Sequence, residues 1–512
     1  MTPALKNPPA NQIAESELLN NESCYRALAA KDPRFDGVFF VGVKTTGIYC
    51  RPICTAKTPR PSSCTFYTGA AAAEAAGFRP CLRCRPELAP YALQQNLAYA
   101  VWQRIAAGAL NQHNDDNTTT SGLEKLATEV GLSSRQLRRV LLQHFGVTPI
   151  ELAQTQRLLF AKKLLQETRL SMTALADAAG FGSVRRFNAL FNARYGLAPT
   201  ALRKQHTSSE TDTAQDVVTV RLAYRPPFNW DQMLAYLQPR LIAGVEAVQL
   251  AQPRPAYLRN ICIDNVRGWI RVTHLIKQQQ LEVEVAPSLT SMLMPLLARL
   301  RQQFDLDANP ALITVHLRLD PALTGLIDAL PGIRVPGTFA PFELAIRAIL
   351  GQQVSVAGAT TLTARLVSRF GSASETPFAV LTHHFPEPAV LAALPVATLA
   401  SIGIPTSRAE TLRNMAQYAA EGRLQNKPGT NLAETITQLT AIPGIGNWTA
   451  HYIALRALRF PDAFPAGDLG LQKAMALRIH GEGRLTEKQL TAVAAAWTPW
   501  RGYAALLLWQ SL

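Results

Sequence analysis

Two close pairs of cysteines near the start of the chain have the spacing of a metal site. Cys50 and Cys54 form a C-x3-C pair, and Cys81 and Cys84 form a C-x2-C pair, with 26 residues between the pairs. Two thiolates on one turn can chelate a single ion, and two such pairs complete the tetrahedral set that Zn²⁺ prefers. The spacing therefore predicts one Zn²⁺ held by four cysteines, in preference to redox-active or merely buried thiols.

A zinc site of this composition has two chemical uses. Four cysteine ligands leave no open position for water, so the metal is not expected to hydrolyse a substrate. Either the ion only holds the fold, or one thiolate is itself the reagent, because zinc keeps a thiol deprotonated while the sulfur retains a nucleophilic lone pair. Cys24 and Cys64 fall outside the spacing and are expected to be ordinary small residues.

A glycine-rich block and a later aspartate mark a second stretch of interest near the C-terminal end. The block Pro443–Gly446 (PGIG) lies between two segments of apolar periodicity, and Asp468 directly precedes the segment LGLQKA. The glycines allow a tight hairpin whose backbone N–H groups can point at a DNA phosphate. Taken alone, however, PGIG is most often a plain turn, and Asp468 could serve only as the N-cap of the next helix.

Two polar stretches divide the chain into the parts that must position these residues. Residues 111–120 (NQHNDDNTTT) and 205–216 (QHTSSETDTAQD) lack hydrophobic periodicity and indicate linkers. They separate a cysteine-bearing part, a helical part and a long C-terminal part. A chain of 512 residues is long enough for about three or four domains, each with its own core.

The helical part contains two similar passages. Each has a short apolar-periodic helix, a glycine at its end, and a second helix that starts near Ser133 or near Ser183. Residues 121–206 carry 13 basic and 5 acidic side chains, and 13 − 5 gives this segment a net charge of +8. This is more than half of the net charge of +15 of the whole chain. Charge concentrated in this way favours a polyanionic partner, most simply nucleic acid, over a merely solvated face.

The C-terminal part changes its periodicity. Alternation in residues 217–224, 261–275 and 281–285 predicts an antiparallel sheet, and helical periodicity returns from Phe342 and continues to Leu512. A composition of 48% hydrophobic and 17% charged residues excludes a wholly disordered chain. No apolar run is long enough to span a membrane and no secretory signal is visible, so we expect no membrane partner.

The blocks TTGIYCRPIC and AGFRPCLRC occur in this order around the cysteines. Over roughly residues 20–90 the chain thereby resembles the N-terminal domain of the Ada family of the adaptive response to alkylation. The resemblance implies irreversible methyl transfer from DNA methylphosphotriesters to a zinc-bound cysteine, here Cys50. It also implies DNA backbone contacts at Thr46, Lys57 and Arg79, although Lys57 replaces an arginine and lacks its bidentate fork.

The duplicated helical passages resemble the AraC-type DNA-binding domain, which carries two helix-turn-helix units. The resemblance implies that the second helix of each unit enters a major groove, where arginine can bind guanine edges or phosphates. A basic helical bundle that binds protein or RNA is the alternative. The candidate DNA-binding residues are Arg135, Arg138 and Arg139 on one helix and Arg185 and Arg186 on the other.

The segments PPFNWDQMLAYL, PFELAIRAILGQQVSV, LTAIPGIGNWTAHYIALRALRF and WTPWRGYAALLLW occur in this order across residues 217–512. Together they resemble 3-methyladenine DNA glycosylase II of the AlkA type, a helix-hairpin-helix enzyme. The resemblance implies that Asp468 is the catalytic carboxylate, which stabilises the oxocarbenium-like sugar as an alkylated, cationic base departs. The chain reads PAGD at this point, so the Gly-Pro-Asp signature of the family is not literally present.

The same resemblance assigns further roles. A flipped base would meet the π faces of Trp448, Tyr452 and Trp509, which attract a cation. Gly444 and Gly446 would contact DNA, and Gln353 stands where the family can carry an apolar wedge. Trp448 also occupies the position where related bifunctional enzymes have a Schiff-base lysine, so a monofunctional enzyme is expected. No cysteine cluster follows Asp468, which excludes an iron–sulfur cluster, and carbonyls near Thr440, Ile442 and Ile445 are expected to hold a monovalent cation.

The chain is thus expected to be a multidomain α+β protein. We predict a small zinc-bound α/β domain at residues 1–90, an all-α double helix-turn-helix domain at 91–206, a small antiparallel α+β domain at 217–325 and an all-α helix-hairpin-helix glycosylase domain at 326–512.

The expected function is DNA alkylation repair joined to adaptive-response regulation. Expected partners are alkylated and operator double-stranded DNA and RNA polymerase, in the bacterial cytoplasm at the nucleoid. The alternative is a transcription factor whose inactive glycosylase fold senses damage, which the presence of Asp468 disfavours. A sugar-responsive AraC-type regulator lacks support because no ligand-binding arm replaces the zinc part. A Pro-Cys-His-Arg motif is also absent, so no guanine-O6 methyltransferase module is expected.

Overall fold

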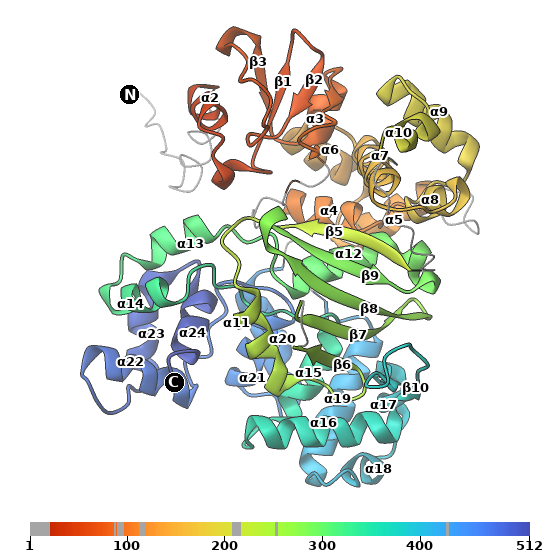
Figure 1. Ribbon diagram of the computed structural model, residues 1–512. Coiled ribbons are helices and arrows are strands. Elements are labelled where there is room, and N and C mark those ends of the chain that lie inside the picture. The colour runs from red at the N-terminus through yellow and green to blue at the C-terminus, as the bar shows by residue number, and fades with distance from the viewer. Residues whose placement is uncertain are drawn as a thin grey trace, which may run out of the picture. The chain divides into compact units, whose positions relative to one another are not determined.

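The computed structural model describes residues 21–86, 89, 97–111, 119–206, 217–250, 254–425 and 430–512. The chain divides into an N-terminal unit, Met1–Thr211, and a C-terminal unit, Asp212–Leu512, whose elements are labelled in Figure 1. Most of each predicted linker lies outside the described residues. Within them, no helix is both long and apolar enough to cross a membrane.

The cysteine-bearing part of the N-terminal unit is a small α/β structure. Its elements are α2 (Asn21–Ala29), β1 (Phe40–Val43), β2 (Ile48–Cys50), β3 (Cys64–Tyr67), α3 (Ala70–Ala75) and β4 (Arg79–Pro80), with single 3-10 turns at Pro33–Phe35 and Pro61–Ser63. The strands pair in the order β3–β1–β2–β4, antiparallel except for the parallel pair β2–β4. Gly42 permits this packing, because a Cβ there would lie 2.9 Å from the rings of Phe78 and Tyr67.

The rest of the N-terminal unit is all-α and carries the duplicated pattern. Its helices are α4 (Leu97–Ala106), α5 (Thr119–Glu129), α6 (Ser134–Phe145), α7 (Pro149–Glu167), α8 (Met172–Ala178), α9 (Val184–Tyr195) and α10 (Pro199–His206). Helices α5 and α8 are each followed by a glycine of positive φ, 69° at Gly131 and 76° at Gly180. Helices α6 and α9 are capped by Ser133 and Ser183, whose hydroxyls accept a backbone N–H bond. The predicted pair of helix-turn-helix units is confirmed.

Both predicted linkers are too long. Helix α5 begins at Thr119, inside the first linker, because the hydrophobic pattern that predicted this helix starts at Leu123 and missed the first turn. Helix α4 precedes that linker and still packs against α6 and α7. The second linker prediction overlaps α10, which continues to His206.

A five-stranded antiparallel sheet opens the C-terminal unit, as the alternation predicts. Its strands are β5 (Val218–Ala223), β6 (Glu246–Gln249), β7 (Ala256–Ile263), β8 (Val266–Leu275) and β9 (Gln280–Val285), in the order β5–β9–β8–β7–β6. The β7–β8 hairpin turns at Asp264 and Asn265, whose φ values of 48° and 65° are the left-handed pair of a two-residue turn. Strand β6 lacks clear alternation, so its residues gave no strand signal.

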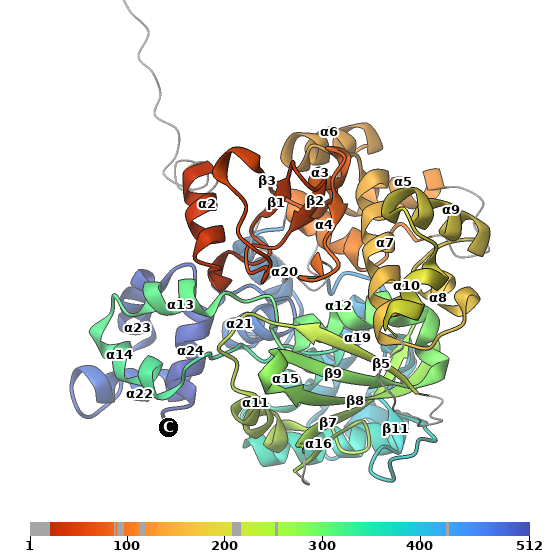
Figure 2. The same cartoon turned by 45° about the horizontal axis from the view of Figure 1, so that its top comes forward.

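Helices in two groups accompany the sheet (Figures 1 and 2). One group holds α15 (Pro341–Leu350), α16 (Val356–Phe370), α17 (Pro388–Ala393), α18 (Val396–Ala400), α19 (Thr406–Ala420), α20 (Leu432–Thr440) and α21 (Asn447–Arg456). The other holds α13 (Pro310–Leu317), α14 (Pro321–Ala329), α22 (Leu469–Ile479), α23 (Glu487–Ala494) and α24 (Arg501–Trp509). The described part of this unit also contains helices α11 (Trp230–Leu237) and α12 (Leu293–Gln303) and the 3-10 turns Gln238–Arg240, Ile276–Gln278, Pro287–Met292 and Ala495–Trp497.

The helical periodicity expected from Phe342 onward is confirmed with one interruption. A short antiparallel ribbon, β10 (Ser372–Ala373) with β11 (His383–His384), separates α16 from α17. The multidomain α+β architecture is confirmed, with the cysteine sheet, the double helix-turn-helix, the antiparallel sheet and the hairpin helices all present.

Candidate functional sites

The four predicted zinc cysteines come together because of one strand pairing. Strands β2 and β4 run parallel, with Tyr49 opposite Pro80, so the two cysteine pairs leave the sheet side by side. The Cys81 N–H donates to the Tyr49 carbonyl at 3.0 Å and fixes this register. As a result, the Sγ atoms of Cys50, Cys54, Cys81 and Cys84 all lie within 4.8 Å of one another.

The donor set fits one tetrahedral Zn²⁺. Zn–S bonds of about 2.3 Å place the sulfurs about 3.8 Å apart, within the spread seen here. Three of the ligands are buried and Cys84 is half-buried. Arg51 braces the site, because its Nε donates to Asp36 at 2.8 Å and its Nη1 donates to the Cys84 carbonyl at 3.1 Å.

Backbone N–H groups donate to sulfurs of the cluster. The Arg51 N–H donates to Cys84 Sγ at 3.4 Å, and backbone N–H groups also donate to the sulfurs of Cys54 and Cys81. Such bonds stabilise the thiolate forms of these sulfurs.

A buried polar network joins the zinc part to the helix-turn-helix part. Glu74 on α3 accepts the Tyr49 hydroxyl at 3.0 Å and the Thr155 hydroxyl of α7 at 2.9 Å, and it pairs with Arg194 of α9 at 3.0 Å. Burial raises the pKa of Glu74, while Arg194 opposes that shift. We call these four residues the Glu74 network; a lone glutamate in the alanine-rich run AAAAEA was its only signal in the sequence.

Helix α7 makes a second buried contact with the zinc part. Lys162, which is fully buried, donates from Nζ to the Cys81 carbonyl at 3.1 Å. Arg85, one residue beyond Cys84, pairs with Glu167 at the end of α7 at 2.8 Å. A ligand loop of the metal site is therefore attached directly to the central helix of the helix-turn-helix part.

The predicted DNA-contact residues of the N-terminal unit all lie on its surface. Thr46 precedes β2, Lys57 follows the first cysteine pair, Arg79 starts β4, and all three are exposed. The candidate recognition residues are likewise exposed on α6 and α9, and they are Arg135, Arg138, Arg139, Arg185 and Arg186. The structure places these arginines on two separate helices, one in each repeat.

The PGIG block forms the predicted hairpin between α20 and α21. Gly444 has a φ of 87°, and a Cβ there would collide with the Thr411 side chain, so only glycine fits. Gly446 is the N-cap of α21 and is exposed. The Gln352 side-chain amide donates to the Gly444 carbonyl at 3.0 Å. The next residue, Gln353, is exposed and has a φ of 56°.

Asp468 is both a helix cap and the acceptor of two indoles. Its Oδ1 accepts the Leu471 N–H at 2.9 Å, which makes it the N-cap of α22. Trp448 Nε1 donates to Oδ2 at 2.8 Å, and Trp509 Nε1 donates to Oδ1 at 3.1 Å. The predicted N-cap is therefore observed, and the cap fixes the carboxylate at the point where α21, α22 and α24 meet.

The three predicted pocket aromatics lie in contact. The rings of Trp448 and Tyr452 are stacked, with centroids 5.2 Å apart and planes 9° apart, and Trp509 meets Tyr452 edge-on at 6.3 Å. One turn after Tyr452, the buried Arg456 donates to the Tyr452 hydroxyl at 2.6 Å. Sequence reasoning missed Arg456, although its i, i+4 spacing from Tyr452 on a predicted helix was a usable signal.

The segment that leads to Asp468 is held by two further bonds. The Phe464 N–H donates to His451 Nδ1 at 3.2 Å, and burial lowers the pKa of His451 to about 4, so this ring is neutral. The Gln472 amide donates to the Ala466 carbonyl at 2.9 Å.

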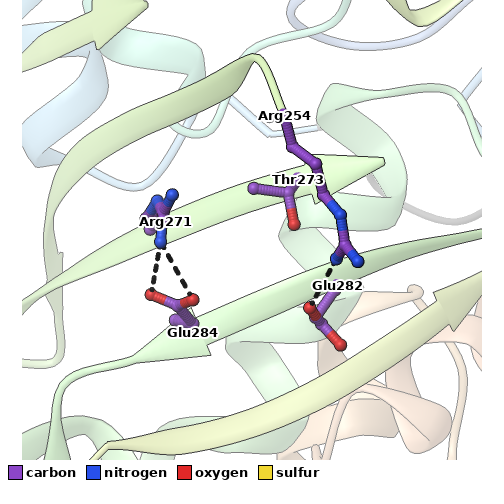
Figure 3. Close-up of a pocket in the computed structure, with 5 residues that line it drawn as sticks. All are labelled: Arg254, Arg271, Thr273, Glu282 and Glu284. Carbon is purple, nitrogen blue, oxygen red and sulfur yellow. Dashed lines mark hydrogen bonds and ion pairs between the residues drawn. The ribbon is translucent and has the colours of Figure 1, made fainter. Parts of the chain in front are cut away.

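A hollow of about 190 Å³ on the sheet of the C-terminal unit is lined by charged residues (Figure 3). Arg271 pairs with Glu284 at 3.2 Å across β8 and β9, and Arg254 pairs with Glu282 at 3.4 Å. Because these four charges are paired with one another, the hollow is explained by ion pairs on the sheet surface, and we do not interpret it as a ligand site.

Four family models match consecutive parts of the chain. They are the metal binding domain of Ada at residues 23–87, a helix-turn-helix domain at 126–205, the AlkA N-terminal domain at 219–340 and the HhH-GPD superfamily of base excision DNA repair proteins at 346–499. Each of the resemblances predicted from the residues is confirmed, and the four-cysteine cluster within the matched metal binding domain confirms the prediction of one Zn²⁺.

Relatives of known name match the same parts of the chain. A protein of Mycobacterium tuberculosis named "Probable bifunctional transcriptional activator/DNA repair enzyme AlkA" is 37% identical over 494 residues, which are 96% of each chain. "DNA-3-methyladenine glycosylase 2" of Escherichia coli is 34% identical over 291 residues, 57% of this chain and 96% of its own. "Bifunctional transcriptional activator/DNA repair enzyme Ada" of the same species is 34% identical over 166 residues, 32% of this chain and 44% of its own.

Proposed function

Since the chain belongs to the family of AlkA-type bifunctional transcriptional activators and DNA repair enzymes, we propose that its two units act on two kinds of alkylation damage. The C-terminal unit is a DNA glycosylase of the helix-hairpin-helix class, and its proposed substrates are alkylated bases such as 3-methyladenine. The N-terminal unit carries an Ada-type metal domain, and it is proposed to accept methyl groups from DNA methylphosphotriesters.

The observation that carries the glycosylase proposal is the carboxylate of Asp468. It is fixed by three N–H donors beside the Trp448–Tyr452 stack. As the cationic base departs with the electrons of the N-glycosidic bond, positive charge develops on the sugar, and a nearby carboxylate lowers the energy of that state. The same group can orient the water that adds to the sugar carbon.

Four finer roles belong to this proposal. The enzyme is monofunctional, because Trp448 stands where an amine would form a Schiff base and its indole instead donates to Asp468. Gly444 and Gly446 present backbone N–H groups to a DNA phosphate, and Gln353 fills the space left by the flipped base. Carbonyls near Thr440, Ile442 and Ile445 are the proposed ligands of a monovalent cation.

The methyl-acceptor proposal rests on Cys50. Bound Zn²⁺ would keep the four thiols ionised at neutral pH. The Cys50 sulfur attacks the methyl carbon of the triester, the S–C bond forms and the C–O bond breaks, and the electron pair stays on the phosphate oxygen. The products are a thioether and an ordinary phosphodiester, so each chain reacts once. Thr46, Lys57 and Arg79 are the proposed contacts to the DNA backbone.

Transcriptional regulation is proposed to use the double helix-turn-helix. The exposed arginines of α6 and α9 bind operator DNA, and RNA polymerase is the proposed further partner, at the nucleoid in the cytoplasm. We retain residues 1–90, 91–206, 217–325 and 326–512 as the proposed domains. The alternative of an inactive glycosylase fold is disfavoured, because Asp468 and its donors form a complete carboxylate site.

One experiment tests both activities together. The protein is incubated with DNA that carries a labelled methyl group, and released bases and label bound to protein are measured separately. The proposal requires both free methylated base and stoichiometric label on the protein, which peptide mapping should locate at Cys50. Base release without label on the protein would contradict the proposed methyl-acceptor function. Label on the protein without base release would contradict the proposed glycosylase function.

O6-methylguanine is expected to persist in DNA incubated with the purified protein. No cysteine of the chain lies in a Pro-Cys-His-Arg context that could accept this methyl group, and the base is uncharged, so the glycosylase gains little by binding it. The measurement is chromatographic quantification of O6-methylguanine before and after incubation, with 3-methyladenine in the same DNA as the positive control. A stoichiometric loss of O6-methylguanine would contradict this expectation.

Methylation of Cys50 is expected to raise the affinity for operator DNA several-fold. Four thiolates outweigh the charge of one Zn²⁺ by two, and a thioether removes one of these negative charges beside a negative backbone. Two unit charges about 4 Å apart interact by about 1–4 kcal/mol between the bulk-water and near-surface limits. The measurement is a titration of operator DNA with methylated and unmethylated protein at several salt concentrations, since screening should reduce the difference.

The matched control for this switch is Cys64→Ser, which alters a half-buried cysteine outside the metal site. That variant should gain affinity on methylation as the unaltered protein does. A Cys50→Ala protein should not respond to methylated DNA. Equal affinities before and after methylation, or a response that survives Cys50→Ala, would rule the switch out.

A further inference from the structure

The two candidate recognition helices, α6 and α9, have matching ends. Each follows a serine N-cap, and each ends at a glycine with a φ of 69°. When the helices are aligned by these ends, Arg194 of α9 stands where α6 has His144. A bond that is made at only one of these two positions therefore distinguishes the two repeats.

Arg194 attaches α9 to the zinc part. Its Nη1 pairs with Glu74 Oε2 at 3.0 Å, and the Glu74 side chain is 1% exposed while the Arg194 side chain is 26% exposed. The same Oε2 accepts the Thr155 hydroxyl of α7 at 2.9 Å, and Oε1 accepts the Tyr49 hydroxyl of β2 at 3.0 Å. One carboxylate of the zinc part therefore holds α9 and α7 at a fixed separation.

This attachment is stronger than an exposed ion pair. Breaking it would leave the Glu74 carboxylate buried without its cation, which is far more costly than separating two charges that water can solvate. Arg185 and Arg186, the candidate DNA-binding residues of the same helix, are exposed. Helix α9 therefore has one side bonded to the zinc part and another side open to a partner.

A second contact lies at the C-terminal end of α9. A Cβ added to Gly196 would lie 3.4 Å from Arg79 Nη1, so the Arg79 guanidinium lies against the end of the helix. A cation is favourable there, because the last carbonyls of a helix carry partial negative charge. Arg79 is exposed and is one of the proposed contacts to the DNA backbone. A proposed phosphate contact of the zinc part is therefore adjacent to α9.

The first recognition helix lacks this polar attachment. Within the described residues, the side-chain hydrogen bonds of α6 are those between Ser133 and Gln136 in its own capping box. His144 is exposed, and none of those bonds involves it. The core cluster that contains α6 includes one residue of the zinc part, Ala71, whose methyl group offers no directional bond.

We propose that Arg194 is a positioning residue for DNA recognition, and that it makes recognition by α9, but not by α6, depend on the zinc part. The half-site at α6 is then read by the helix-turn-helix part alone. The half-site at α9 is read only when the zinc part is folded against that helix. This inference rests on the proposed operator binding by the double helix-turn-helix.

The expected consequence is a loss of affinity that is confined to one half-site. A helix that is not held in its binding position occupies that position only part of the time, and the apparent affinity falls in proportion to that fraction. Since two helix-turn-helix units read separate segments of the major groove, the two half-sites can be altered one at a time. A general loss of protein stability would instead weaken recognition of both half-sites together.

The first test is selection of DNA by the full-length protein from a duplex pool with a randomised segment of about two helical turns. Selection is repeated with Arg138→Ala and Arg185→Ala, which should remove the sequence preference at the half-sites of α6 and α9, respectively. Glu74→Gln and Arg194→Gln should each remove the same half as Arg185→Ala. Loss of the other half, of both halves or of neither by the two variants would overturn the proposal.

The affinity test uses the selected duplex and two derivatives, each with one half scrambled. Glu74→Gln should bind the full sequence between about twofold and about thirtyfold more weakly than the unaltered protein, the range for coupling through a single residue. On the duplex with a scrambled α9 half, the two proteins should bind equally. Arg194→Gln serves if Glu74→Gln fails to fold. Arg194→Lys keeps the charge and should recover most of the affinity that Arg194→Gln loses.

The matched control is Glu129→Gln. Glu129 of α5 pairs with Arg104 of α4 at 2.6 Å, but their side chains are 41% and 42% exposed, so the pair contributes little. This variant makes the same chemical change in the same unit, and it should keep both half-sites and full affinity. If Glu129→Gln weakens the α9 half-site as Glu74→Gln does, the effect is not due to the attachment of α9.

Hydrogen exchange gives a readout that does not require DNA. In Glu74→Gln, the backbone amides of α9 should exchange faster than in the unaltered protein, while those of α6 keep their rates. Equal acceleration in both helices would refute the specific attachment of α9. An unaltered protein that selects no sequence would contradict the proposed operator binding alone, because the exchange measurement would still decide whether the zinc part holds α9.

Discussion

Asp468→Asn is expected to lower the release of 3-methyladenine from alkylated DNA by at least about a thousandfold. Loss of a single preorganised electrostatic group at a reacting centre costs about 10²–10³ in rate, and Asp468 supplies a full negative charge. Asparagine is also a good helix N-cap, so the Leu471 N–H bond can be kept and α22 should remain folded. Base release by gas or liquid chromatography is the measurement, with zinc content and methyl transfer as unaffected readouts.

The chain offers a closely matched control in Asp320→Asn. Asp320 caps α14 through the Ala322 N–H at 2.9 Å and accepts the Trp497 indole N–H at 2.8 Å. It therefore repeats the cap and indole bonds of Asp468 without the stacked aromatics and the hairpin. This variant should release bases at the normal rate with a small loss of stability. If both variants lose activity alike, or Asp468→Asn keeps it, the catalytic assignment fails.

Cys81→Ala is expected to abolish both zinc retention and methyl transfer. Structural zinc contributes about 10–16 kcal/mol to the folding of small metal domains, so three cysteines should not hold this part together. The variant should also weaken operator binding, because the Cys81 loop is attached to Lys162 of α7. Base release should be unchanged, since Asp468 lies in the other compact unit. The measurements are metal analysis, label transfer and operator titration on one preparation.

Cys262→Ser is the control for this variant. Cys262 lies on β7 of the C-terminal unit and outside the four-cysteine cluster. Zinc content and methyl transfer should equal those of the unaltered chain. Full methyl acceptance by Cys81→Ala would show that the four-cysteine site is not needed for the reaction.

Features written in short stretches of sequence were predictable, and features assembled across the chain were not. The cysteine pairs and the PGIG turn are local patterns, and Ser133 and Ser183 mark helix starts by their own chemistry. In contrast, Arg456 lies about 120 residues after Pro336 and Gly337, and only packing shows that its guanidinium donates to their carbonyls.

The same limit explains the errors at element boundaries. Hydrophobic periodicity reports buried side chains, so it detects α5 only from Leu123 although the backbone is helical from Thr119. Hydrophobic periodicity also cannot predict which buried polar groups are hydrogen-bonded to each other. The bonds from Lys162 to Cys81 and from Thr155 to Glu74 each span 81 residues, and neither partner is unusual in its own segment.

The Glu74 network has a consequence for how such proteins can be recombined. Its members come from the zinc sheet, α3, α7 and α9. If the zinc part were kept and the helix-turn-helix part replaced, the buried Glu74 carboxylate would lose its bonds to Thr155 and Arg194. A chimaera joined near residue 90 must therefore carry Thr155 and Arg194 along with Glu74. A joint between the two compact units cuts no part of this network. The zinc part and the helix-turn-helix part can therefore be exchanged only together, and the C-terminal unit can be exchanged separately.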